Sequence, residues 1–426
     1  MFLSNGLVTQ FFIPIVILLG LATLASVLLK LFKLDFLPVF AIEILIGLII
    51  AKWFNGYMET LELTSVVDGI YVLGLTLIIF LGGYEVEFDV SKDININEQN
   101  DCSLCKHRKC WKCKYINVLK VALVLTIFSY IAALIVSVMF GSFIEGNKFL
   151  GIIVLTLVFA STFAGLVVPI LHEKELMKSA IGKTLATIAD LSEALSIIFL
   201  TILMIVVELE RQYWYIIALI ALILITFTVI RKYRVGSFLG RFAEGVDHLA
   251  TRVVVIIVLV FVLLSNLAGG EYLLGAFIAG IFVRRAKFSE NVMRSLERII
   301  YGIFAPMFYI LVGTQIDIVS LLSSWQSIRL VLLLTVALLA VELPVLYLLR
   351  WYNWKTVLPS VVLMSCTIIV PIAARELNHN LNLFSDQFAQ SLILASLIIC
   401  VLGTIFFATR FPFSQLKKDE KEIAHE

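Results

Sequence analysis

The residue types best suited to binding small ions form two groups in the sequence. Asp190 and Glu193 lie three residues apart in the apolar segment TLATIADLSEALSIIFL, a spacing that places both carboxylates on one face of a helix. Ser161 and Thr162 in ASTFAGLVVPIL could offer hydroxyl oxygens. Carboxylate and hydroxyl oxygens suit protons and small hard cations, and burial favours the protonated form of a carboxyl group. These residues predict a proton or cation site centred on Asp190, with Glu193 as a second candidate.

A second kind of chemistry is indicated by the cysteine-rich segment CSLCKHRKCWKC. Its pattern, C-x2-C-x4-C-x2-C, can supply four thiolates to a tetrahedral zinc ion, and a four-cysteine iron–sulfur cluster is a less favoured possibility. A basic loop with free thiols and a redox switch are the other interpretations. The predicted metal ligands are Cys102, Cys105, Cys110 and Cys113.

The elements that must position these residues are membrane-spanning helices. The chain of 426 residues is 61% hydrophobic and 15% charged, with a mean hydropathy of +1.03, so it has too few charges to cover soluble domains. Its net charge of +2 indicates no nucleic-acid partner. We expect an all-α polytopic membrane protein with about thirteen spans of a length that crosses the hydrocarbon of a bilayer. The expected spans are residues 10–31, 37–54, 66–83, 118–140, 149–171, 182–207, 213–230, 251–267, 272–284, 300–316, 327–349, 356–374 and 386–409.

The distribution of positive charge predicts the orientation of the chain. All but five of the 33 Lys and Arg residues fall on alternate connections between the spans, and Lys and Arg concentrate on the cytoplasmic side of membrane proteins. We therefore expect a multi-pass protein of the cell membrane, with the N-terminus outside and the C-terminus in the cytoplasm. The five residues on the other side are Lys52, Lys148, Arg211, Arg329 and Arg375.

Three pairs of segments indicate an internal repeat. EILIGLII resembles GAFIAGIF, LIIFLGGYEVEFD resembles FYILVGTQIDI, and ASTFAGLVVPIL resembles MSCTIIVPIAA. The members of each pair are seven expected helices apart, so the two copies run in opposite directions through the membrane. Inverted repeats with matching interrupted helices are typical of secondary transporters, and the interruptions mark the ion site. We expect helices 5 and 12 to be the interrupted pair.

The spacing of the repeat places the cysteines in an insertion. Gly82 and Gly313 are 231 positions apart, whereas Pro169 and Pro371 are only 202 apart, so the first copy is longer by about 29 residues. The expected organisation is helices 1–3 in residues 1–95, a cytoplasmic cysteine-rich insert in 96–117, helices 4–7 in 118–230, helices 8–13 in 249–409, and a cytoplasmic tail in 410–426.

A carboxylate in the middle of a membrane span is expected to have a function or an ion-pair partner, because its insertion is costly. Its insertion costs on the order of 3 kcal/mol, and the sequence offers no Lys or Arg deep in helices 5, 6, 10 or 12 that could pair with Asp190. Function is therefore the favoured explanation for Asp190. Glu43 and Glu342, in other spans, are expected to be buried and to be protonated or hydrogen-bonded to neighbouring helices.

Nearly the whole chain outside the insert resembles the monovalent cation:proton antiporters, especially the antiporter-2 branch of sodium/proton and potassium/proton exchangers. The resemblance is carried by LPVFAIEILIGLIIA, LGLTLIIFLGGYEVEFD, LLGAFIAGIFV, APMFYILVGTQIDI and ASTFAGLVVPILHE. It implies a homodimer in which one domain dimerises and another moves, with helices 5 and 12 crossing beside the ion site. Asp190 matches the ion-carrying carboxylate of the family and Thr162 matches its helix-5 threonine.

The chain departs from the family pattern at two places. Ala189 stands where the family usually has Asn, Asp or Gln, and the basic residue that many members carry in helix 10 or 12 is missing unless Arg375 reaches inward. A single titrating carboxylate favours one-for-one exchange unless Glu193 supplies a second charge.

The favoured function is secondary active transport in which protons are exchanged for monovalent cations by alternating access. Asp190 would bind the cation and the proton in competition, with oxygen ligands from Ser161 and Thr162. The resemblance favours Na+ over K+ as the substrate, and transport needs no cofactor. The alternative is a transport-inactive membrane sensor of metal or redox state, acting through the four cysteines. An enzyme is not expected, because no Ser/His or His-cluster arrangement lies at membrane depth.

Overall fold

The computed structural model describes residues 2–31, 39–85, 118–208, 249–267, 272–286, 288 and 290–413. The helices in these ranges gather into two compact units, each made from two separate stretches of chain. The first unit combines residues 1–85 with 201–318, and the second combines 86–200 with 319–426. Each unit thus takes helices from both halves of the sequence. The predicted cysteine ligands, at positions 102–113, lie outside the described residues.

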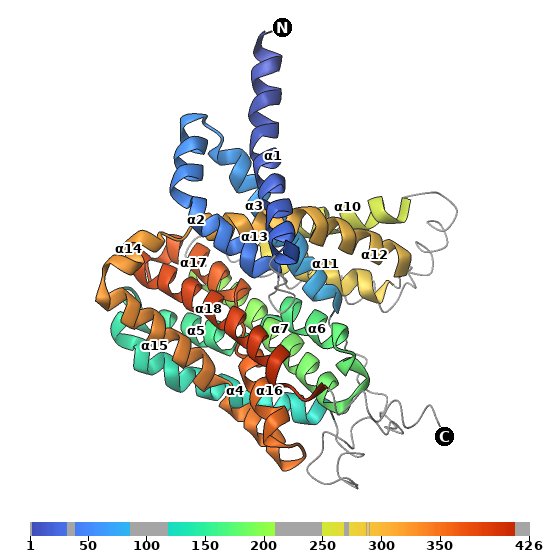
Figure 1. The fold of residues 1–426 in the computed structure, drawn as a ribbon, viewed down its shortest axis with the longest axis vertical. Coiled ribbons are helices and arrows are strands. Elements are labelled where there is room, and N and C mark those ends of the chain that lie inside the picture. Colours follow the sequence, from blue (N-terminus) through green and yellow to red (C-terminus); the bar gives the residue numbers. More distant parts are fainter. Residues whose placement is uncertain are drawn as a thin grey trace. The chain divides into compact units, whose positions relative to one another are not determined.

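The first unit is built mainly from apolar helices, and the short, charged helix α12 is the exception (Figure 1). Helices α2 and α13 pack against each other, as do α3 and α11, and α10 packs on α11. A π-helical turn, Ile300–Phe304, joins α12 to α13, so the expected span 300–316 belongs to a longer helical stretch that begins at Glu290. The bounds are α1 Phe2–Leu31, α2 Val39–Thr60, α3 Thr64–Glu85, α10 Leu249–Leu267, α11 Tyr272–Arg285, α12 Glu290–Ile299 and α13 Ala305–Thr314.

The second unit holds the predicted ion-binding residues, which lie on α7 and between α5 and α6. Helix α4 packs on α5, and α15 and α16 both pack on α18. The bounds are α4 Val118–Met139, η3 Phe140–Phe143, α5 Lys148–Ala160, α6 Ala164–Glu173, η4 Leu176–Lys178, α7 Ala180–Glu208, α14 Ile318–Ser323, α15 Trp325–Val341, η6 Leu343–Arg350, α16 Trp354–Met364, α17 Ile369–Leu381 and α18 Asp386–Arg410. The boundary between the units cuts two of these helices, so the part of α7 after Leu200 and the first residue of α14, Ile318, belong to the first unit.

The helices agree well with the expected membrane spans. Within the described ranges, ten helical stretches are long and apolar enough to cross a membrane. Two further expected spans are helical as α7 and as α11, and the span expected at 213–230 lies outside the described residues. The described chain is therefore nearly all helical, as the sequence predicts.

Helix α4 shows how a membrane protein orders its residues. Its buried side chains are mostly small or polar and recur every three or four positions, from Ala122 through Thr126 and Ser129 to Ala133 and Ser137. Its exposed positions carry Ile, Leu, Val and Phe. In lipid, apolar side chains can face outward without a penalty, while small and polar residues allow close helix packing and interhelical hydrogen bonds. The polar stripe of α4 therefore points into the second unit.

Glycines permit the two closest helix crossings of the first unit. Gly47 on α2 faces the backbone of Ile310 and Gly313 on α13, so a methyl group at this position would overlap the Ile310 carbonyl. Gly83 on α3 lies against α11 in the same way, since a methyl group at this position would overlap the Phe277 carbonyl. Gly280 of α11 lies against the α3 backbone at the same crossing. Each crossing thus joins one helix of the first proposed repeat to one helix of the second. Within α3, Gly83 makes the close contact, whereas a methyl group at the adjacent Gly82 would meet no atom within 4 Å.

Adjacent glycines on α3 provide a matched test of this packing. Gly83→Ala should lower the free energy of unfolding by about 1–3 kcal/mol, because the added methyl group overpacks the α3–α11 crossing. Gly82→Ala should be neutral or stabilising by up to about 1 kcal/mol, since a methyl group at Gly82 meets no atom within 4 Å and Ala favours the helix. Thermal unfolding of the purified variants in detergent would measure the difference. Equal stability of the two variants would contradict the close approach.

Candidate functional site

The first predicted interruption lies between α5 and α6. Helix α5 ends at Ala160 and α6 begins at Ala164, which leaves Ser161, Thr162 and Phe163 outside the helical ladder. Thr162 is 0% exposed and Ser161 is 2% exposed. Pro169 lies inside α6, well past the break, so the opening falls at the Ser-Thr pair and not at the proline. This opening places polar backbone and two hydroxyl groups in a buried position.

The second interruption lies between α16 and α17. It covers the residues between Met364 and Ile369, and Pro371 falls in the first turn of α17, where a proline removes no helical hydrogen bond. The two interrupted spans are also the most buried of the ten candidates, with 78% of the apolar window of residues 148–172 and 89% of that of 354–375 buried. They therefore lie at the centre of the second unit.

The two interruptions are hydrogen-bonded to each other. The Phe163 N–H donates to the Cys366 carbonyl at 2.7 Å, and the Thr162 hydroxyl donates to the Met364 carbonyl at 2.9 Å. The hydroxyls of Ser161 and Thr367 lie 2.7 Å apart. Backbone groups freed by unwinding must be satisfied by protein inside a membrane, and each break supplies partners for the other. The sequence indicated both breaks, whereas the roles of Thr367 and of the Met364 and Cys366 carbonyls came only from the structure.

Glu193 supplies a buried acceptor at the start of α6. Its carboxylate Oε2 accepts from the Ala164 N–H at 2.8 Å, and its side chain is 7% exposed. The first amides of a helix lack intrahelical partners and carry the positive end of the helix dipole, which favours an anionic acceptor. Glu193 thus holds the reopened helix by a charge-assisted hydrogen bond. Glu193, a predicted candidate for the site, thus has a defined partner at the first helix break.

Asp190 lies one turn before Glu193 on α7. Its side chain is partly buried and its Oδ1 atom is fully enclosed. Helix α7 runs antiparallel to the α5–α6 pair, because Ser196 bonds the Leu157 carbonyl of α5 while Glu193 bonds the start of α6. A shift of three residues moves about 4.5 Å along the helix. The carboxyl group of Asp190 therefore lies alongside the first turns of α6, beyond the Glu193 contact.

Two thiols lie beside the second interruption. Cys366 Sγ is 3.6 Å from the Ile399 carbonyl, and Cys400 Sγ is 3.5 Å from the Thr367 carbonyl. Both cysteines are buried and unbridged. They pack α18 against the break. Among the described residues, no group of three or more His, Cys, Asp or Glu side chains is placed to hold a metal ion.

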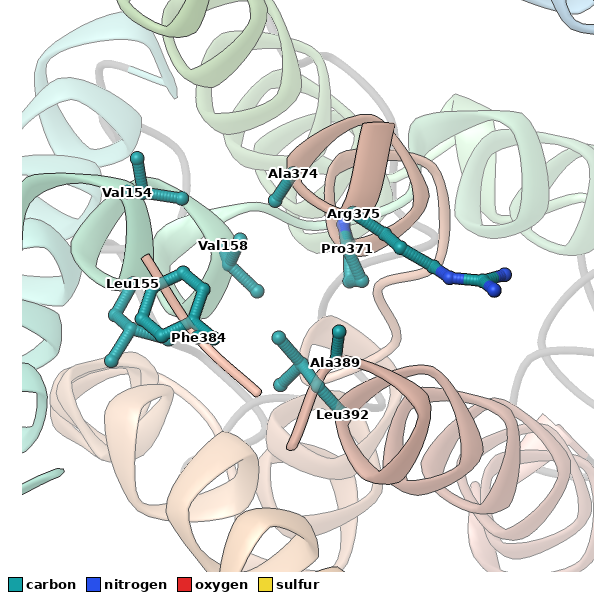
Figure 2. A pocket seen from close by; sticks show the side chains of 9 residues that line it. All are labelled: Val154, Leu155, Val158, Pro371, Ala374, Arg375, Phe384, Ala389 and Leu392. Atoms are coloured by element: carbon teal, nitrogen blue, oxygen red, sulfur yellow. The ribbon is translucent and has the colours of Figure 1, made fainter. Parts of the chain in front are cut away.

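Arg375 lies at a small apolar cavity of the second unit. The cavity has a volume of about 10 Å³, roughly the space of one water molecule, and it is lined mainly by Val, Leu, Ala, Pro and Phe side chains of α5, α17 and α18 and the segments next to them. Figure 2 shows Val154, Val158 and Phe384 on one side of the cavity. Arg375 lies on the other side, and its guanidinium group extends away from these three residues. Its mainly apolar lining does not provide the oxygen ligands of a cation site. The oxygen-rich crossing of the two breaks remains the candidate site.

The fold and the site define a class of protein. A multi-pass membrane protein with two interrupted helices that cross at buried polar residues has the architecture of a secondary transporter. The chain belongs to the sodium/hydrogen exchanger family, since the family's transmembrane model matches residues 15–411.

Two proteins with similar sequences carry names that agree with this family assignment. The chain is 28% identical over 413 residues to YjbQ of Bacillus subtilis (strain 168), a protein named for an inferred Na+/H+ antiporter activity; the match covers 96% of this chain and 64% of YjbQ. The chain thus spans less than two thirds of that relative. It is 24% identical to antiporter 3 of Methanocaldococcus jannaschii, also named for an inferred Na+/H+ antiporter activity, over 68% of this chain and 77% of the relative.

A solved structure supports the fold. The structure of the sodium proton antiporter MjNhaP1 from Methanocaldococcus jannaschii at pH 8 matches with a TM-score of 0.56 and 14% identity, over 96% of this chain and 99% of that chain. At this identity the likeness concerns the fold alone. It agrees with the expected all-α membrane architecture.

The Glu193 contact predicts a graded loss of stability. Glu193→Ala should lower the free energy of unfolding by about 1.5–3 kcal/mol, because the Ala164 N–H loses a charged acceptor. Glu193→Gln should have a smaller effect, since an amide oxygen can still accept. The neighbouring Ser192→Ala is the control, because the Ser192 hydroxyl donates only within its own helix. Thermal unfolding in detergent would test the order, and a Glu193→Ala protein as stable as Ser192→Ala would contradict the contact.

Proposed function

We propose that the protein exchanges protons for monovalent cations across the cell membrane, with Na+ favoured over K+. The observation that supports this best is the buried crossing of the two interrupted helices, where Glu193 of α7 binds the start of α6 and Asp190 lies one turn before Glu193 on α7. Membership of the exchanger family and the names of the relatives point in the same direction. The antiporter-2 branch remains the branch that the sequence motifs favour.

Asp190 is the group in this proposal that binds the cation and the proton in competition. A carboxylate forms a neutral unit with either ligand, so the loaded site can cross a low-dielectric region in both directions. The hydroxyl oxygens of Ser161 and Thr162, which lie at the break, would complete the coordination of a dehydrated cation. Glu193 would keep the start of α6 in place and could share the bound ion.

Alternating access completes the transport cycle. A moving domain would carry the site between the two sides of the membrane, while the other domain anchors a homodimer in the bilayer. Charge distribution places the N-terminus outside and the C-terminus in the cytoplasm in this proposal.

Substitution of the central carboxylate tests the proposal. In proteoliposomes, Na+ or K+ added on one side should drive proton movement by the wild-type protein, and Asp190→Asn should abolish it, because the amide cannot exchange a proton for a cation. In the acid range the apparent KM for the cation should fall about tenfold per unit rise in pH, since the competing proton is withdrawn. A fluorescent pH probe inside the vesicles would follow both effects.

Two controls make this experiment decisive. Asp68→Asn removes a carboxylate near the start of α3 in the first unit and should leave the flux unchanged. The thermal unfolding of Asp190→Asn should match that of the wild type, which separates loss of function from loss of fold. A folded wild-type protein that moves no protons with either cation would favour the sensor interpretation.

We also propose that the four-cysteine insert binds zinc and regulates transport. Metal analysis of natively purified protein should find about one zinc per chain, as expected for four thiolate ligands. Replacement of Cys102, Cys105, Cys110 and Cys113 by Ser should remove the metal. Replacement of the buried Cys366 and Cys400 by Ser is the control that should retain it. Iron with inorganic sulfide would instead indicate a cluster, and a metal-free protein would contradict the proposal.

A further inference from the structure

The end of α5, at the first helix break, is bound by α7. Leu157 and Val158 lie in the last turn of α5, where carbonyl groups lack donors within their own helix. The Ser196 hydroxyl of α7 donates to the Leu157 carbonyl at 2.9 Å, and Ser196 is 0% exposed. The Val158 carbonyl accepts from the Ser161 hydroxyl at 2.8 Å. A side chain of α7 therefore replaces part of the hydrogen bonding that unwinding removes from α5.

One turn of α7 thus contacts both sides of the break. Glu193, three residues before Ser196, accepts from the Ala164 N–H at the start of α6 at 2.8 Å. Ser196 holds the end of α5, so the two contacts together fix the position of α7 along the interrupted helix. Asp190 lies one turn further along α7, in the direction away from Ser196. The place of the Asp190 carboxyl group relative to the break therefore depends on these two contacts.

Tyr130 of α4 extends the Ser196 contact to a third helix. Its hydroxyl lies 2.7 Å from the Ser196 hydroxyl and donates to the Ser192 carbonyl at 3.1 Å. A hydroxyl group has one proton, and the Ser196 proton goes to the Leu157 carbonyl. Tyr130 is therefore the donor to Ser196, and its proton is shared with the Ser192 carbonyl. A chain of hydrogen bonds thus runs from α4 through α7 to the end of α5, and such chains hold their members in one arrangement.

Neighbouring polar residues of α4 make different contacts. The Ser129 hydroxyl donates at 3.2 Å to Oε2 of Glu342, the residue that follows α15. The Ser137 hydroxyl donates to the Ala133 carbonyl, four residues earlier in α4 itself. Of these three hydroxyl groups of α4, the one that contacts α7 belongs to Tyr130. Its loss should therefore affect α7 in a way that the loss of the Ser137 hydroxyl does not.

We propose that Tyr130 and Ser196 are positioning residues of the exchanger, which hold α7 against the first break and so set the place of Asp190. The proposal rests on the proposed exchange at Asp190. Neither hydroxyl is a ligand of the transported cation; both act through the Asp190 carboxyl group. A cation site requires its ligands within about 0.5 Å of their productive positions. Removal of either hydroxyl should therefore weaken cation binding in a protein that still folds.

Transport kinetics in proteoliposomes test the proposal. Tyr130→Phe and Ser196→Ala each remove one hydroxyl group. Each should raise the apparent KM for Na+ by about tenfold or more, the usual loss of metal affinity when a residue that orients a ligand is removed. The maximum rate should stay within about twofold of that of the wild type, since the group that binds the cation is still present. A purely structural role would act in the opposite way, because a misfolded fraction lowers the maximum rate and leaves KM unchanged.

The double variant tests whether the two hydroxyl groups act as one chain. If Tyr130 acts through Ser196, Tyr130→Phe combined with Ser196→Ala should have nearly the KM of Ser196→Ala alone, whereas independent effects would multiply to about a hundredfold. Ser137→Ala is the matched control, because Ser137 is a buried residue of α4 that donates within its own helix, and it should keep the wild-type KM. Single variants with the wild-type KM, or a double variant that shows the product of both effects, would overturn the proposal.

Hydrogen exchange tests the positioning without any transport. The backbone amides of residues 161–166 should exchange faster in Tyr130→Phe and in Ser196→Ala than in the wild type and in Ser137→Ala, because α7 then holds the break less firmly. Mass spectrometry of peptides from the purified protein in detergent would measure this rate. Unchanged exchange in both variants would overturn the proposal. If the wild type moves no ions, the proposed transport function fails, while the amide exchange still decides whether the two hydroxyl groups hold the break.

Discussion

Satisfaction of backbone hydrogen bonds inside the membrane is the constraint on which the rest of the second unit depends. Unwinding a helix at membrane depth exposes N–H and C=O groups that lipid cannot bind, and each orphaned group costs several kcal/mol. Here the break between α5 and α6 and the break between α16 and α17 satisfy each other through Phe163, Thr162 and Ser161. The crossing can exist only because both helices open at the same place. Neither break would be stable alone.

The buried carboxyl groups divide their tasks according to their partners. Glu193 accepts a hydrogen bond from a backbone N–H at a helix start, which gives its carboxyl group a fixed position. Glu342 has a single neutral hydroxyl, which cannot hold a charge in a dry site. Asp190 is partly buried on α7, one turn before Glu193, and its Oδ1 atom is enclosed. Buried carboxyl groups of this chain therefore differ in their partners, which are a helix N-terminus for Glu193 and a hydroxyl group for Glu342.

Much of the fold could be predicted from the sequence because the bilayer imposes simple rules. Length and hydropathy predicted nearly every described helix, and the Ser-Thr and Val-Pro pairs pointed to both breaks. The position of each break was less predictable, since the prolines at 169 and 371 suggested a kink that instead occurs upstream. A proline tolerated within or near the start of a helix does not mark where the chain unwinds; the hydrogen bonds available across the crossing do.

The sequence by itself determined the membrane class, nearly every described helix and the presence of two carboxyl groups, Asp190 and Glu193, in one apolar span. These features follow from local composition, because hydropathy and periodicity act along the chain. Only the tertiary structure decided that Gly83, not Gly82, lies at a helix crossing, that Glu193 holds the start of α6, and that Glu342 meets Ser129. Such contacts join residues from distant parts of the chain, and their partners depend on how helices rotate and cross, which the order of the residues does not reveal.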